Sequence, residues 1–259
     1  MLSHIEILGY SILDEPAGRV AAAVCDELSH ERPKSFVFLN PHSVVIAERN
    51  PAFRDAIVGA QGIFCDGVGL SLAGMLLKHR RPVRVYGFEF FTALSRELSA
   101  RKMGRVFFLG GSADSIAELV GKYRAEFSGI PAVGGYAPPY RNQFCDAELQ
   151  EMAGRIGEFA ADILWIGLGS PKQEKVLLEL MRRCRLSCGA AIGAVFDFYT
   201  GRVPHAPALI RRAGLQWVHR LALEPRRLWR RTLVSSPLFV GLVLRQWLHA
   251  ALAPRRRAP

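Results

Sequence analysis

One aspartate stands where it could act as a general base in catalysis. Asp66 ends the apolar run GIFCD at 62–66, and the stretch CDGVGL continues after it with two glycines. Because glycine has no side chain, a substrate could approach the carboxylate closely at this point. The residues alone leave two interpretations of Asp66 open, a catalytic base and an aspartate that caps a turn or helix.

Two further junctions have the composition of phosphate-binding turns. The run FLGG ends in Gly110 and Gly111 and is followed by SADS, whereas GLGSPKQE at 167–174 contains Lys172 and Gln173. Backbone N–H groups at a helix N-terminus bind diphosphates and similar anions. Neither junction has the glycine fingerprint of a dinucleotide site or a P-loop, so each could also be a structural turn before a well-capped helix.

A third junction, LNPHS at 39–43, contributes Asn40 and His42. A lone histidine is more often structural than catalytic, and no cluster at ligand spacing accompanies it, so we expect neither a metal centre nor a cofactor. The five cysteines are odd in number and lack framework spacing, which argues against a disulfide scaffold. Together with an N-terminal segment that lacks a signal-peptide pattern, this favours a reducing cytoplasm.

Short apolar runs alternate with helix-like stretches along most of the chain. We expect buried strands at 36–40, 62–66, 105–110 and 163–169, with a further candidate at 190–198. We expect helices at 43–59, 68–79, 113–127, 146–160 and 171–183. Continuous apolar runs indicate strands covered on both faces, so the predicted fold is α/β, a Rossmann-like parallel sheet flanked by helices. Such a sheet binds ligands at the carboxyl ends of its strands.

The net positive charge is confined to the C-terminal region. The 259-residue chain has a formal charge of +11, and residues 202–259 hold twelve arginines and one acid, Glu224, which account for all of it. We therefore divide the chain into a core, residues 1–201, and a basic appendage, residues 202–259. A charge gathered in this way indicates an anionic partner, which could be a phosphorylated ligand, a membrane surface or a nucleic acid.

Three helices are expected in the appendage. The stretch 206–224 is helix-like, Pro225 suits the first turn of a second helix, and 236–254 forms a third. Arg245 and His249 interrupt the apolar third stretch, which makes it too short and too polar to span a bilayer. We expect it to lie in the membrane interface.

Taken in order, these motifs resemble those of the WecG/TagA/CpsF family of bacterial glycosyltransferases. The matching motifs are LNPHS, CDGVGL, RVYGFEFF (84–91), FFLGG, WIGLGSPKQE, GAVFDFYTGRVPHAP (193–207) and GLQWVHRLALEPRRLWRR (214–231). They cover roughly residues 35–231. The PKQE element and the arginine-rich ending are the most specific of them.

The resemblance implies an inverting, metal-independent hexosyltransferase with a Rossmann-like core. Such an enzyme transfers a sugar from a UDP-sugar to a polyprenyl-diphosphate-linked saccharide, in the synthesis of surface polysaccharides or exopolysaccharides. The donors it leaves open are UDP-N-acetylmannosamine, its uronic acid and UDP-glucose. It also implies a peripheral position on the cytoplasmic face of the membrane, contact with an anionic membrane surface but no nucleic acid, and self-association into a homo-oligomer.

Residue roles follow from the same resemblance. Asp66 matches the catalytic base, which takes the proton from the acceptor hydroxyl. The polar residues of the donor pocket are matched by Asn40, Arg84, Gln173 and Asp197, to which the turn chemistry adds Gly110, Gly111 and Lys172. The residues expected on the diphosphate are Arg220, Arg227 and Arg230. The chain departs from the family pattern at Phe38, Glu89 and His205, which leaves the donor sugar open.

Arginine suits a transferase without a metal ion, because its guanidinium group is always charged and binds phosphate oxygens in a bidentate manner. The sequence places Arg220, Glu224, Arg227 and Arg231 at the spacing of one helical face, on the condition that Pro225 does not bend the helix.

Two alternatives compete with the transferase. One is a nucleic-acid-binding α/β protein, and the other is a nucleotide-dependent oxidoreductase, which the missing glycine fingerprint disfavours.

Overall fold

The computed structural model describes residues 2–204, 206–207, 209–210, 216–223, 225–229 and 233–252. Its centre is an eight-stranded sheet in the order β1-β2-β4-β3-β8-β7-β5-β6. The strands are β1 (His4–Ile7), β2 (Tyr10–Leu13), β3 (Lys34–Leu39), β4 (Gly62–Cys65), β5 (Arg105–Gly110), β6 (Ala132–Tyr136), β7 (Ile163–Gly167) and β8 (Cys188–Ala191). Every neighbouring pair is parallel except β1 with β2, which confirms the predicted class of sheet.

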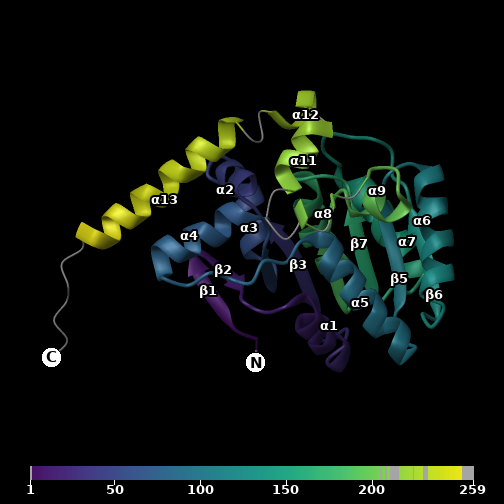
Figure 1. Cartoon of the computed structure of the whole chain (residues 1–259). Coiled ribbons are helices and arrows are strands. Elements are labelled where there is room, and N and C mark those ends of the chain that lie inside the picture. The colour runs from purple at the N-terminus through teal and green to yellow at the C-terminus, as the bar shows by residue number, and fades with distance from the viewer. Residues whose placement is uncertain are drawn as a thin grey trace.

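Helices cover both faces of the sheet (Figure 1). One face carries α2 (Pro41–Ala47), α3 (Pro51–Val58), α4 (Val68–Lys78), α7 (Asp146–Glu158) and α8 (Lys172–Arg183). The other face carries α1 (Ala17–Asp26), α5 (Gly87–Arg101), α6 (Ala113–Glu126) and α9 (Val195–Thr200). The apolar residues therefore form two cores, one on each side of the sheet.

Strand β7 shows why the central strands are continuously apolar. Ile163 and Trp165 belong to one core, whereas Leu164 and Ile166 belong to the other, and all four side chains are fully buried. Successive strand residues point to opposite faces, so a strand covered on both sides has no position for a polar side chain.

Two predicted elements are corrected by the structure. The helix expected at 43–59 is two helices, because Asn50 caps α3 with Pro51 in its first turn and so breaks the path of α2. The strand candidate at 190–198 ends at Ala191, and most of its remainder forms α9. A short apolar run does not distinguish a buried strand from a buried helix by its period.

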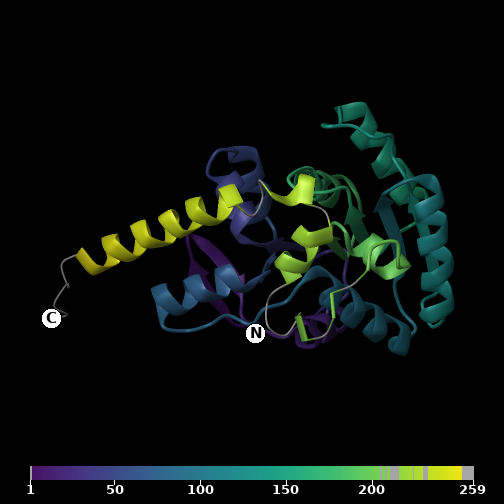
Figure 2. The same cartoon turned by 45° about the horizontal axis from the view of Figure 1, so that its top comes forward.

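Among the described residues of the appendage lie the helices α11 (Gln216–Leu223), α12 (Pro225–Trp229) and α13 (Ser235–Leu252). Pro225 opens α12, as predicted from its place in the sequence. Phe239 and Val243 are buried and attach α13 to the core shared with α2 and α4, while its C-terminal half extends past the body (Figures 1 and 2). Within the described residues, no helix has the length and apolar character needed to cross a membrane. The division of the chain at residue 201 stays a prediction.

The end of β5 provides a stability test. Gly110 has φ +132°, and a Cβ there would meet the Gly167 carbonyl oxygen at 2.4 Å. We expect Gly110→Ala to lower the free energy of unfolding by about 2–4 kcal/mol. The new Cβ would clash with a backbone carbonyl that cannot move aside, and the positive φ would add backbone strain. Urea unfolding measures the change.

Gly121→Ala is the matched control, since Gly121 lies in α6 with open space around the position of a Cβ. It should raise the free energy of unfolding by about 0.5–1 kcal/mol. Equal stability of the two variants would contradict the close approach of β5 and β7.

Candidate active site

A crevice is expected between β3 and β8, because these adjacent parallel strands lead to opposite faces of the sheet. The chain leaves β3 into α2, which joins one core, and leaves β8 toward α9, which joins the other. Diverging connections open a ligand crevice at the carboxyl ends of such strands. Asn40 follows β3 and Asp197 lies in the first turn of α9, so the structure brings these two candidates to this edge.

Asp66 lies beside Asn40 at the ends of adjacent strands. Leu39 and Cys65 are paired in the register of β3 and β4, and the Asp66 N–H donates to the Leu39 carbonyl at 2.9 Å. Asn40 caps α2, with its Oδ1 accepting from the Ser43 N–H at 3.1 Å. The residue at the N-cap of α4 is Gly67, at φ +98°, and no side chain caps this helix. Asp66 is therefore not the capping residue of α4.

Arg84 is brought to the other side of the β4 end. It pairs with Cys65 in an isolated parallel bridge, and the Val85 N–H donates to the Cys65 carbonyl at 3.0 Å. Burial raises the pKa of Glu89 in the first turn of α5, and the nearby Arg84 guanidinium and the Tyr86 backbone partly oppose that rise. A basic and an acidic side chain thus flank the end of β4.

Close backbone contacts form the floor of the crevice on its other side. Gly110 pairs with Gly167 in the register of β5 and β7. A Cβ on Gly167 would meet the Phe196 ring at 2.5 Å and the Gly193 carbonyl at 3.1 Å. Gly111 has φ +69° and precedes Ser112, whose side chain caps α6. The peptide groups of this turn are therefore not covered by side chains of their own, as a phosphate-binding turn requires.

Gln173 is buried at the start of α8 and faces the loop after β8. A Cβ on Gly193 would lie 3.6 Å from its amide. Its Oε1 accepts from the Gly169 N–H at 3.2 Å, and its Nε2 donates to Glu174 Oε1 at 3.1 Å. Gln173 is thus held by a backbone group and a buried carboxylate, which fixes its orientation against the loop after β8.

Lys172 is directed elsewhere. Its Nζ contacts the Arg141 carbonyl and lies 5.1 Å from the ring centres of Tyr140 and Phe144, in the loop after β6. Partial burial lowers the pKa of its ammonium group. Successive residues of a helix point about 100° apart, so Lys172 and Gln173 do not share one pocket wall.

The arginine candidates are only partly described. Arg220 lies in α11 and Arg227 in α12, two separate helices, so the single face predicted from their spacing does not form along one helix. Their side chains, as well as Glu224, Arg230, Arg231 and His205, lie outside the described residues. In both overall views α11 lies over the carboxyl edge of the sheet, between α4 and α9 (Figures 1 and 2).

Sequence reasoning missed the contributions of Glu174, Gly167 and Gly193. All three stand inside quoted motifs, but only the fold shows that Glu174 is buried against Gln173 and that the two glycines touch. Across the described part of the chain, no group of three or more His, Cys, Asp or Glu residues is arranged to hold a metal ion.

Residues 5–252 match the model of the Glycosyl transferase WecG/TagA/CpsF family. The chain belongs to this family. Its membership identifies it as a glycosyltransferase and favours this function over the nucleic-acid-binding alternative.

Two relatives carry the name N-acetylglucosaminyldiphosphoundecaprenol N-acetyl-beta-D-mannosaminyltransferase. The protein from Bacillus spizizenii W23 is 30% identical over 218 residues, which are 84% of this chain and 81% of the relative. The protein from Bacillus subtilis 168 is 27% identical over 246 residues, which are 95% of this chain and 87% of the relative.

The thiol before Asp66 gives a pH-dependent test of the site. Burial raises the pKa of Cys65 to about 12, with the Asp66 carboxylate adding to the effect, whereas Cys145 is exposed. A raised pKa keeps the thiol protonated, so around pH 8 very little Cys65 is present as the reactive thiolate. We expect iodoacetamide to modify Cys145 and to leave Cys65 unmodified, as measured by peptide mass spectrometry.

Unfolding in guanidinium chloride is the control, because it should make all five cysteines reactive. Modification of Cys65 in the folded protein at the rate of Cys145 would show that the end of β4 is open to solvent.

Proposed function

We propose that this glycosyltransferase moves a sugar from a UDP-sugar to a saccharide linked to polyprenyl diphosphate. The observation that carries the proposal is the placement of Asp66 beside Asn40 at the edge where the connections of β3 and β8 diverge. The names of the two relatives favour N-acetylmannosamine as the sugar, over its uronic acid or glucose, and N-acetylglucosaminyl-diphosphoprenol as the acceptor. The reaction would serve the synthesis of surface polysaccharides or exopolysaccharides.

In this proposal Asp66 is the general base. Its carboxylate takes the proton from the acceptor hydroxyl while the hydroxyl oxygen attacks the anomeric carbon of the donor. The bond from that carbon to the UDP oxygen breaks as the new glycosidic bond forms, and UDP leaves with the electron pair. Attack from the face opposite the leaving group inverts the anomeric centre.

The leaving diphosphate needs positive charge or N–H donors, and two sets of residues would supply them, backbone N–H groups and arginines. The N–H groups of Gly110, which ends β5, and of Gly111, which precedes the N-cap Ser112 of α6, form the first set. The donor would be oriented by Asn40, Arg84, Gln173 and Asp197, whereas Lys172 is directed toward the loop after β6 and is left out of this set. The diphosphates would be bound by Arg220, Arg227 and Arg230. A fixed donor in a closed site lowers such a barrier by about 3 kcal/mol, and no metal ion is required in this scheme.

We further propose that the enzyme works on the inner face of the membrane as a peripheral protein. Lys78 is exposed at the end of α4 and Arg81 after it, Arg245 is exposed on α13, and Trp247 and Leu248 beside it are exposed apolar side chains. Basic residues bind anionic headgroups, and tryptophan favours the interface. Self-association into a homo-oligomer stays a prediction from the family resemblance.

The general base is tested with Asp66→Asn. We expect kcat to fall by about 10²–10⁴, because the amide cannot accept the proton, while UDP binding by calorimetry stays largely unchanged. The assay measures UDP release from a panel of UDP-sugars with an N-acetylglucosaminyl-diphosphoprenol acceptor and EDTA.

Asp55→Asn is the control, since Asp55 is an exposed carboxylate on α3. Normal turnover by Asp66→Asn would remove Asp66 from the role of base. Loss of wild-type transfer in EDTA would refute the metal-independent scheme.

Membrane contact is tested by charge reversal. We expect Arg81→Glu and Arg245→Glu each to weaken binding to vesicles rich in phosphatidylglycerol by roughly tenfold, because each replaces an attraction of about 1 kcal/mol with a repulsion. Arg96→Glu on α5, at the opposite face of the sheet, should have no effect in the same sedimentation assay. Equal losses in all three variants would mean that net charge alone, and no particular face, governs binding.

A further inference from the structure

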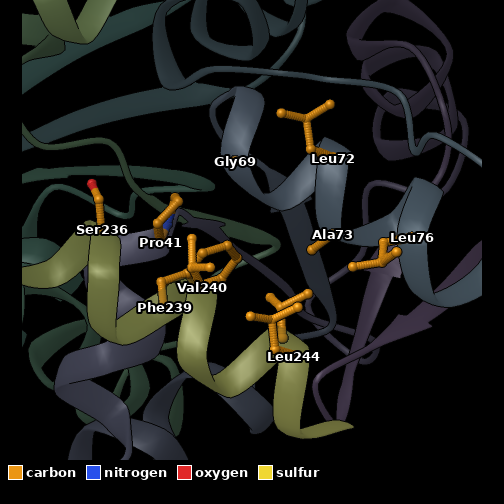
Figure 3. Close-up of a pocket in the computed structure, with 10 residues that line it drawn as sticks. Pro41, Gly69, Leu72, Ala73, Leu76, Ser236, Phe239, Val240 and Leu244 are labelled. Carbon is orange, nitrogen blue, oxygen red and sulfur yellow. The ribbon is translucent and has the colours of Figure 1, made fainter. Parts of the chain in front are cut away.

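An apolar groove runs between α4 and α13. It is lined by Pro41, Gly69, Leu72, Ala73, Leu76, Ser236, Phe239, Val240, Val243 and Leu244, and it encloses about 260 Å³. Nine of these ten residues carry no polar side-chain atom. In Figure 3, Ala73 and Leu76 of α4 face Val240 and Leu244 of α13 across the groove.

The inner end of the groove adjoins the proposed catalytic residues. Pro41 directly follows Asn40, and Gly69 lies three residues after Asp66. The two lining residues are in contact, because a Cβ on Gly69 would meet Pro41 Cγ at 2.6 Å. The groove is therefore continuous with the edge of the sheet at which the reaction is proposed to occur.

The outer end of the groove is basic and lies away from the sheet. From Gly69 to Leu76 it follows two turns of α4, about 11 Å. Lys78 lies two residues after Leu76, and Arg245 directly follows Leu244. Both basic residues are exposed. A ligand that enters beside Asp66 and leaves at this end would pass through an apolar channel and emerge among charges that suit lipid headgroups.

We propose that this groove binds the prenyl chain of the acceptor, in the segment next to its diphosphate. The inference rests on the proposed function and adds to it the path of the lipid. An acceptor with its sugar hydroxyl at Asp66 must carry a hydrocarbon chain out of a polar crevice. The groove begins at that crevice and offers the chain a nearly unbroken apolar lining.

The exposure of the lining supports a ligand in this position. Leu72 is 50% exposed, Val240 52% and Leu244 45%. A continuous apolar surface of this kind is unfavourable in water, so it indicates a binding site for an apolar ligand. The bilayer itself is a poorer occupant than a single chain, because the lining residues face one another across a hollow. Met75 and Leu248 are equally exposed on the same helices but lie outside the groove lining, so they provide matched controls.

The experiment compares two acceptors with the same N-acetylglucosaminyl-diphosphate head in detergent micelles, one with a long prenyl chain and one with a short alkyl chain. The wild-type enzyme should have the lower KM for the long chain. Leu72→Glu and Leu244→Glu should raise that KM by about tenfold or more, since loss of contact with two methylene groups has this effect. Neither variant should change kcat/KM for the short acceptor.

The controls Met75→Glu and Leu248→Glu should retain the preference for the long chain. Val240→Trp fills the groove and keeps it apolar, so it should weaken use of the long acceptor without weakening binding to vesicles. Equal losses in the groove and control variants would assign the surface to general lipid contact and overturn the proposal. Retention of the chain-length preference by the groove variants would also overturn it.

A photoreactive prenyl diphosphate separates this proposal from the transferase scheme, because cross-linking needs no turnover. Cross-links within 69–76 and 236–244 would support the groove whichever sugar is transferred. Cross-links elsewhere would refute the groove and leave the sugar-transfer reaction standing. Failure of the wild-type enzyme with every UDP-sugar and both acceptors would instead refute the proposed function.

Discussion

Close contact between glycine backbones at the carboxyl ends of the parallel strands is the constraint on which the proposed site depends. Gly110 lies so close to Gly167, and Gly167 to Gly193, that no side chain fits between them. The strands can therefore end side by side while the turns above them keep their peptide groups uncovered. Helices α6 and α8 begin shortly after β5 and β7, so the N–H groups of their first turns lie at the same edge, where the Ser112 side chain accepts from one of them, the Ser115 N–H. A diphosphate could bind to such a surface, because its oxygens accept hydrogen bonds from exposed backbone N–H groups.

The central strands could be predicted from the sequence, but the margins of the sheet could not. In β7 burial on both faces excludes polar residues, so a short, unbroken apolar run that ends in glycine indicates the strand. β1 is half exposed, carries His4 and Glu6, and pairs in the opposite direction, so it lacks that pattern. Helix α5 is not among the predicted helices, although Phe90, Phe91 and Leu94 lie at helical spacing on its buried face.

The positions of the polar candidates were predictable where the residue directly follows a strand. Asn40 and Asp66 follow adjacent strands, and the register places them together. The orientation of Lys172 was not predictable, because it depends on Tyr140 and Phe144 in a loop distant along the chain. The arginine spacing was extrapolated through Pro225 along one helix, whereas the chain forms two helices there, α11 and α12. Local spacing determines a shared face only while the helix continues.

The attachment of α13 links this C-terminal helix to the start of α2, the helix that follows Asn40. His42 Nδ1 lies 2.7 Å from Ser235 Oγ, and His42 stands two residues after Asn40 in the same helix start. If a ligand binds more tightly when α13 is packed against α2, binding of the ligand stabilises the packed position of α13. The two effects are equal in free energy. On the proposed path of the acceptor, occupancy of its site and the position of α13 would therefore be coupled through the His42–Ser235 contact and the packing of α13 against α2 and α4.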